Sequence, residues 1–192
     1  DHHVAPSHPE YFPLPKRERD VAAAKKLLAD AGFPNGLDID LIVGNTQGRY
    51  EQDCAQILQQ NCLEAGIRLN LKVIPAAQYW PIWDKAAFSL TYWAHRPLGV
   101  MSLELAYRGG GAWNESHYSD PAFDAALDRA MGIIDPKQRA VAMQSVEQIL
   151  QDACVIVQPF WGDKFTAVSK KVQGFEVHPS DFYPMGNVWL SA

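Results

Sequence analysis

The residues best suited to bind a ligand lie in a short aromatic and basic segment, residues 91–98 (TYWAHRPL). The segment follows a strand-like stretch and is interrupted by Pro97, which indicates a loop at the end of a strand. In open α/β sheets, ligands bind at such carboxyl ends. A guanidinium offers two parallel donors to a carboxylate, so we predict that Arg96 contacts a ligand carboxylate. The alternative is an internal ion pair with Asp84 or Glu104.

Aromatic side chains and one amide complete this candidate binding site. Trp93 either stacks on a ligand or fills core between a strand and a helix. Trp113 and Asn114 follow the glycines of residues 109–111, whose missing Cβ atoms let a ligand approach the backbone. Tyr92 points away from Trp93 in a regular strand, which favours a core position. The predicted ligand-binding set is Tyr92, Trp93, Arg96, Trp113 and Asn114.

The sequence has no recognisable signature of catalysis or of cofactor binding. His95, His117 and His178 are isolated, and no Ser or Cys lies in a nucleophile motif. The glycines of residues 109–111 follow a helical stretch and lack the Lys-Ser/Thr ending of a phosphate loop. We therefore expect a binding protein that makes and breaks no bonds and needs no cofactor.

Three histidines near the start, His2, His3 and His8, raise the question of a metal site. A histidine third from a free amino terminus chelates copper or nickel, which requires Asp1 to be a true terminus. No set of His, Cys and carboxylate residues has coordinating spacing. We interpret these histidines as part of a solvated lead-in and predict no metal site.

Composition indicates a globular domain of a processed chain or a fragment. The 192 residues are 47% hydrophobic and 20% charged, with a net charge of −5 that argues against nucleic acid as a partner. No stretch approaches the ~20 apolar residues that span a bilayer, and neither a signal peptide nor an initiator Met is present. We expect Cys54, Cys62 and Cys154 to be small core residues, and a disulfide would have to involve Cys154.

Periodicity predicts the elements that position the site. Residues 1–15 contain four prolines and form an extended lead-in. Asp20 caps a helix that ends at Gly32, with an inward face of Val21, Ala24, Leu27, Leu28 and Ala31. Alternating apolar residues predict strands over 37–43 and 67–73. Between them a helix starts near Arg49, with Tyr50, Cys54, Ile57, Leu58 and Cys62 facing inward. The three elements make a βαβ unit with parallel strands.

The second half of the chain continues this α/β pattern. A short aromatic helix with Tyr79, Trp80 and Trp83 leads to a third strand near residues 88–93. Asp120-Pro121 and Asp135-Pro136 each place a capping carboxylate before a first-turn proline and so predict two helices. Residues 154–160 and 165–168 are predicted to form later strands.

Six segments in order resemble one known family. They are residues 24–36 (AKKLLADAGFPNG), 56–67 (QILQQNCLEAGI), 113–124 (WNESHYSDPAFD), 135–139 (DPKQR), 148–153 (QILQDA) and 172–175 (VQGF). Together they are similar to the signatures of peptide/nickel-type solute-binding proteins of ABC importers, although Cys154 replaces a usual proline. The resemblance runs from about Pro6 to the end of the chain.

The resemblance implies a two-lobed, type II periplasmic-binding-protein fold with a mixed, partly parallel sheet. It divides this chain into a lead-in (1–15), a C-terminal ligand-binding lobe (16–159) and a tail (160–192) that returns to the missing N-terminal lobe. It also implies hinge closure on a peptide-like solute, an ABC permease as partner, and a periplasmic or lipoprotein-anchored location.

The resemblance leaves the ligand open among peptides, opines, sugars and nickel chelates. Where many relatives use an aspartate to receive a peptide amino terminus, no acid lies between Lys85 and Glu104. A non-catalytic protein-interaction module is the alternative function.

Overall fold

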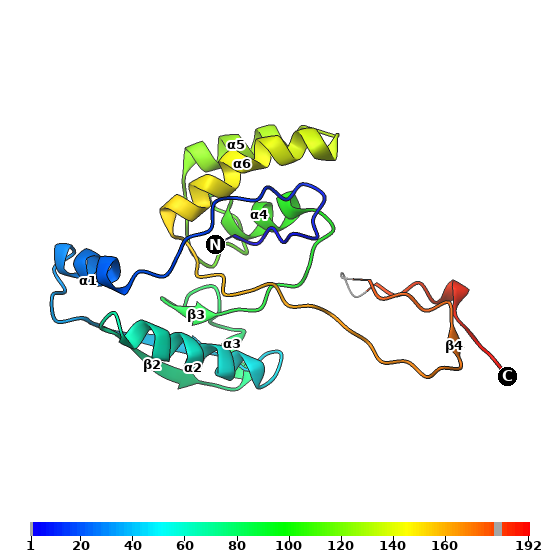
Figure 1. Cartoon of the computed structure of the whole chain (residues 1–192), viewed down its shortest axis with the longest axis horizontal. Helices are drawn as coiled ribbons and strands as arrows, with labels where there is room; N and C mark the ends of the chain where they lie inside the picture. The colour runs from blue at the N-terminus through cyan, green and yellow to red at the C-terminus, as the bar shows by residue number, and fades with distance from the viewer. Residues whose placement is uncertain (1, 179–181) are drawn as a thin grey trace. The chain divides into compact units, whose positions relative to one another are not determined.

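The computed structural model describes residues 2–178 and 182–192. Contacts divide the chain into two compact units. We call Pro15–Tyr92 the sheet unit, and Asp1–Leu14 together with Trp93–Ala192 the helical unit. Figure 1 labels most of the helices and strands of both units.

The sheet unit is built on the predicted βαβ arrangement. Its elements are α1 (Val21–Asp30), β1 (Leu37–Val43), α2 (Tyr50–Leu63), β2 (Ile67–Val73), α3 (Ala76–Tyr79) and β3 (Ser89–Leu90). The strand order is β2-β1-β3, and both pairings are parallel. Leu37 pairs with Ile67 and Val43 with Val73, whereas β3 meets only the last two residues of β1.

The core of the sheet unit lies between the sheet and α2, which covers one of its faces (Figure 1). Leu41, Val43, Ala55 and Leu69 are its buried members. Glu51 is also buried, because its carboxylate accepts hydrogen bonds from Thr46 N and Oγ1, both at 2.7 Å, and from Gln47 N at 3.1 Å. These bonds hold the turn before α2 and offset the cost of burying a charge.

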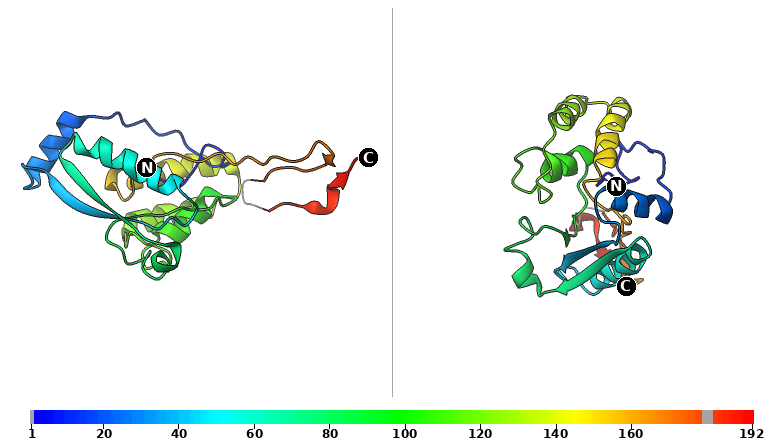
Figure 2. Two further views of the ribbon diagram at one scale, coloured as in Figure 1. Left: turned by 90° about the horizontal axis from the view of Figure 1, so that it is seen from below. Right: turned by 90° about the vertical axis from the view of Figure 1, so that its left-hand side faces the viewer.

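The helical unit contains α4 (Gly99–Tyr107), α5 (Pro121–Met131), α6 (Pro136–Ala153), β4 (Val172–Gln173), the 3₁₀ helix η1 (Met185–Asn187) and β5 (Trp189–Leu190). Both predicted caps are confirmed: Asp120 accepts from Ala122 N and Asp135 from Gln138 N, each at 2.8 Å. β4 and β5 pair antiparallel, close to the C-terminus of the chain (Figure 2, left).

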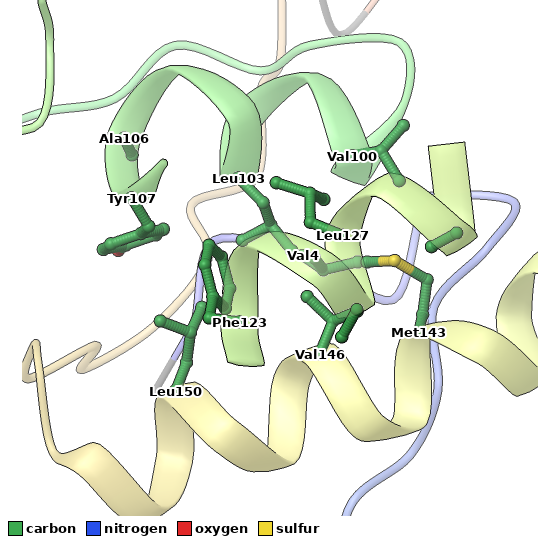
Figure 3. Packing of buried hydrophobic residues seen from close by; sticks show 12 residues of the cluster. Val4, Val100, Leu103, Ala106, Tyr107, Phe123, Leu127, Met143, Val146 and Leu150 are labelled. Carbon is green, nitrogen blue, oxygen red and sulfur yellow. The ribbon is translucent and has the colours of Figure 1, made fainter. Parts of the chain in front are cut away.

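The largest core lies between α4, α5 and α6 (Figure 3). Leu103, Phe123, Leu127, Met143, Val146 and Leu150 interdigitate there. Val4, from the start of the chain, is a fully buried member of the same cluster. It packs against Gly99 so closely that a Cβ added there would lie 2.7 Å from Val4 Cγ1. A glycine at the first residue of α4 is therefore what allows this segment to dock.

The histidines predicted to lie in a solvated lead-in are instead buried: His2 is 4% exposed and His8 5%. The physical reason is long-range packing, since residues 1–14 belong to the helical unit and Val4 anchors them in its core. The segment contains no helix or strand in its described part, as its prolines predict. The predicted division at residues 15 and 159 concerns the whole two-lobed protein and stays a prediction.

Other sequence expectations were wrong in detail. Within the described residues, 154–160 and 165–168 form no strand, because no neighbouring strand pairs with them. The predicted inward face of α1 is not buried, and Leu27 is 68% exposed. Ile57 of α2 and Cys154 are also exposed, where inward positions were expected.

A buried carboxylate lies where α6 meets the N-terminal segment. Glu147 is fully buried, its oxygens have no hydrogen-bond partner among the described residues, and Oε2 lies 3.6 Å from His2 Nε2. Burial, together with the nearby Glu10, raises the pKa of Glu147 to about 8, whereas burial lowers the pKa of His2 to about 4. At pH 7 this contact therefore joins two neutral groups.

The raised pKa of Glu147 predicts a loss of stability at alkaline pH. The folded-state pKa of Glu147, about 8, exceeds the ordinary 4.5. Its contribution to the free energy of unfolding is therefore complete below the ordinary pKa and is lost as pH rises through 8. His2 titrates at lower pH, so between pH 6.5 and 8.5 we expect the free energy of unfolding to fall by on the order of 2 kcal/mol more in wild type than in Glu147→Gln. Denaturant melts across this range measure the difference. Glu176→Gln, the same change at an exposed position, is the control. Parallel curves for wild type and Glu147→Gln would contradict the assignment.

Candidate functional site

Trp93 begins the helical unit and is fixed from two sides. Its indole Nε1 donates a 2.7 Å hydrogen bond to Glu115 Oε1, and its ring packs on the main hydrophobic core. The His3 ring lies 5.2 Å from it, and Tyr107 OH lies 3.2 Å from His3 Nδ1. The half-buried ring thus packs on core and keeps some exposed surface, and its stacking on a ligand stays a prediction.

Arg96 lies beside Trp113, with its guanidinium carbon 5.7 Å from the indole centroid. This is within the range of a cation–π contact. Arg96 Nε is buried and has no hydrogen-bond partner among the described residues. The predicted alternative partner Glu104 pairs with Arg108 instead, and Arg108 also reaches Asp128 at 2.6 Å. The structure thus leaves a half-buried cation whose Nε could still donate a hydrogen bond.

Trp113 joins Arg96 and Trp93 into one aromatic and basic cluster. The Trp93 and Trp113 rings are 6.2 Å apart in an edge-to-face arrangement, which is a favourable geometry for two aromatic rings. Trp113 is 47% exposed. We call Trp93, Arg96 and Trp113 the aromatic–arginine cluster.

Asn114 organises the loop that carries Trp113. It is 6% exposed, and its Nδ2 donates to Arg108 O at 3.0 Å and to Tyr118 O at 2.7 Å. Its Oδ1 accepts from Ser116 Oγ at 2.8 Å. The side chain thus links both ends of the turn between α4 and α5, and its predicted contact with ligand stays a prediction.

Tyr92 is the predicted site residue that the structure assigns to the sheet unit, where it is half-buried. It lies near Tyr50, and burial together with Glu51 and Tyr92 raises the pKa of Tyr50 to about 12. Among the five predicted residues, the structure thus brings together Trp93, Arg96 and Trp113, supports them with Asn114, and leaves Tyr92 in the other unit.

The contributors that sequence reasoning missed are His3 and His8. His3 lies against Trp93, and His8 Nε2 lies 2.9 Å from the carbonyl oxygen of Arg96. No local spacing could identify these contacts, because each joins residues about 90 positions apart.

Other site types were also searched in the described part of the chain. Its His, Cys, Asp and Glu residues include no group of three or more that could hold a metal ion, and no helix there is long and apolar enough to cross a bilayer. An open groove of about 620 Å³ lies in the sheet unit beside β1 and β3. It is lined by Asp38, Ile39, Asp40, Ala87 and Phe88, none of them a predicted site residue.

The hydrogen bonds of Asn114 predict that the loop depends on it. In Asn114→Ala, the carbonyls of Arg108 and Tyr118 lose their donor inside the turn, which costs about 1–3 kcal/mol of unfolding free energy. Ser116→Ala removes one bond of the same network and should cost less. Chemical denaturation measures both. An Asn114→Ala variant within about 0.5 kcal/mol of wild type would show that the loop is held by other contacts.

Comparison with known proteins identifies the family of this chain. Residues 2–109 match the sequence profile of the bacterial extracellular solute-binding proteins, family 5, middle part. Heme-binding protein A of Haemophilus influenzae is 23% identical over 83% of this chain and 31% of its own length. The periplasmic oligopeptide-binding protein OppA of Escherichia coli is 25% identical over 87% of this chain and 31% of its own length.

A solved structure agrees with these relatives. The structure of HbpA2 from Haemophilus parasuis superposes with a TM-score of 0.73 at 25% identity, over 97% of this chain and 40% of that one. The chain spans about a third of the length of the curated relatives it matches. Its parallel sheet flanked by helices is part of the type II periplasmic-binding-protein fold. The profile covers more than half of the residues, and the chain belongs to family 5 of the bacterial extracellular solute-binding proteins.

Proposed function

We propose that this chain is the ligand-binding lobe of the substrate-binding component of an ABC importer, and that it captures a small peptide or peptide-like solute through a carboxylate. One observation carries the proposal: Arg96 lies over Trp113 with its Nε buried and unpartnered among the described residues. Family membership supplies the class of protein, and the aromatic–arginine cluster supplies the chemistry.

The electrostatics of Arg96 favour an anionic ligand. A partly buried cation that lacks a counter-charge and a full set of hydrogen bonds carries a desolvation cost. A carboxylate relieves that cost with two parallel charge-assisted hydrogen bonds, which a neutral group cannot match. Glu104, one of the two acidic residues that the sequence offered as partners, is occupied by Arg108. A ligand carboxylate at Arg96 therefore does not compete with Glu104.

The tryptophans supply an apolar wall of fixed orientation. Trp93 is held by Glu115 and by the main core, and Trp113 is carried on a loop that Asn114 ties together. Binding to preorganised side chains costs less conformational entropy than binding to mobile ones. Half-exposed rings beside a cation suit a ligand with both an apolar part and an anionic group.

The names of two relatives point to the same ligand chemistry. One is an oligopeptide-binding protein and the other a heme-binding protein. Peptides end in a carboxylate, and haem bears carboxylates beside a large apolar ring. A carboxylate next to apolar surface is thus common to both ligand classes, and peptide is the one that we propose for this chain.

Capture then requires the remainder of the protein. Ligand held by Arg96 and Trp113 gains further contacts when a second lobe closes over it, which shifts the population toward the closed state. The closed protein docks on a membrane permease outside the cytoplasm, and no bond is made or broken. The exposed Leu27 and Ile57 are consistent with surface that the rest of the protein covers.

The proposal predicts which ligands stabilise the full-length protein. We would screen di- to pentapeptides, opines, sugars and nickel chelates by thermal shift. Peptides should stabilise the folded protein by RT ln(1 + [L]/Kd) and so raise its melting temperature. By titration calorimetry, Arg96→Ala should weaken binding of the peptide probe tri-alanine by about tenfold or more, since a charge-assisted pair is lost.

Arg129→Ala is the matched control, because Arg129 is an exposed cation on α5 of the same unit. It should leave tri-alanine binding within about twofold, which is the usual range for surface changes. Arg96→Ala with an affinity equal to that of this control would refute the role of Arg96. Stabilisation by no ligand class would refute the solute-binding function itself.

A further inference from the structure

His8 connects the N-terminal segment to the aromatic–arginine cluster. Its ring is 5% exposed and stacks on the ring of His95, with centroids 4.6 Å apart and planes inclined by 14°. Its Nε2 lies 2.9 Å from the carbonyl oxygen of Arg96. The histidine therefore contacts both residues that lead to Pro97, just before α4 begins.

The hydrogen bonds of His8 join two segments of main chain. The Arg96 carbonyl is only an acceptor, so Nε2 carries a proton and donates it to this oxygen at 2.9 Å. On the other edge of the ring, Nδ1 lies 2.8 Å from the backbone nitrogen of Ala5 and 3.2 Å from its carbonyl oxygen. The ring thus links the main chain of Ala5 to that of Arg96.

We infer that His8 is a positioning residue of the ligand site: its ring holds the main chain of Arg96 so that the guanidinium lies over Trp113, and loss of that hydrogen bond weakens ligand binding. This inference rests on the proposed function, in which Arg96 binds the ligand carboxylate. It gives the N-terminal segment, through His8, a part in the site.

The first test needs no ligand. Trp113 reports on Arg96 because the guanidinium lies 5.7 Å from its ring. Full-length protein labelled with ¹⁵N-tryptophan gives one indole N–H signal for each tryptophan, and Trp113→Phe identifies the signal of Trp113. We expect this signal to shift in a His8 variant that cannot donate a hydrogen bond to the Arg96 carbonyl.

Two substitutions separate the hydrogen bonds of His8 from the packing of its ring. His8→Gln keeps a donor and an acceptor, whereas His8→Phe keeps a ring and loses both. We expect His8→Phe to shift the Trp113 signal and to bind tri-alanine about fivefold to tenfold more weakly, which corresponds to one lost hydrogen bond. We expect His8→Gln to retain the wild-type signal and affinity. His117→Asn, a change at an exposed histidine with a positive φ of 54° that Asn tolerates, is the control.

The outcomes are distinguishable from a failure of the proposed function. A Trp113 signal that is unchanged in His8→Phe overturns the inference, whatever ligand the protein binds. So does a His8→Gln variant that is as impaired as His8→Phe while its melting temperature is unchanged. If tri-alanine does not bind but the Trp113 signal follows the expected pattern, the hold on Arg96 stands and only the choice of ligand is wrong.

Discussion

Docking of the N-terminal segment on α4 is the constraint on which the candidate site depends. Val4 fills space that Gly99 leaves open at the first residue of α4. Burying a valine side chain contributes roughly 1.5–3 kcal/mol. Buried Glu10 accepts a hydrogen bond from Val100 N at 3.2 Å, where the first turn of α4 has no acidic residue of its own. A carboxylate is favoured at this position because the amino end of a helix carries partial positive charge. With the segment in place, His3 and His8 reach Trp93 and Arg96.

The site follows from this constraint by a short series of contacts. The docked segment fixes the main chain at Arg96, while the core and Glu115 fix Trp93. Asn114 independently fixes the loop that presents Trp113. The arginine is left beside an indole with a buried Nε that has no partner in the described chain. Such a group suits the proposed role of Arg96, since a cation already neutralised by an internal acid gains little from a ligand carboxylate.

Local sequence signals predicted the local structure well. The caps at Asp120 and Asp135, the alternation in β1 and β2 and the intervening α2 all depend on residues within a few positions of one another. Trp93, Arg96 and Trp113 were predicted to be binding residues from their types and from the glycines and proline beside them. The three side chains lie together in one cluster, and their contact with a ligand stays a prediction.

The burial of polar residues could not be predicted, because long-range contacts decide it. Glu10 meets Val100 across 90 positions and His8 meets Arg96 across 88. A proline-rich stretch with three histidines has the composition of a solvated linker, and only the space above Gly99 makes it part of a core. The apolar stretches at 154–160 and 165–168 fail as strands for the converse reason. Their composition suits a sheet, but a strand forms only where another strand pairs with it.

The central claim is that a carboxylate on the ligand, recognised by Arg96, drives binding. The most direct measurement compares the affinity of the full-length wild-type protein for tri-alanine and for tri-alanine amide, which differ in that group alone. We expect the amide to bind at least about tenfold more weakly, as the loss of a charge-assisted pair requires. Equal affinity for the acid and the amide would contradict the account.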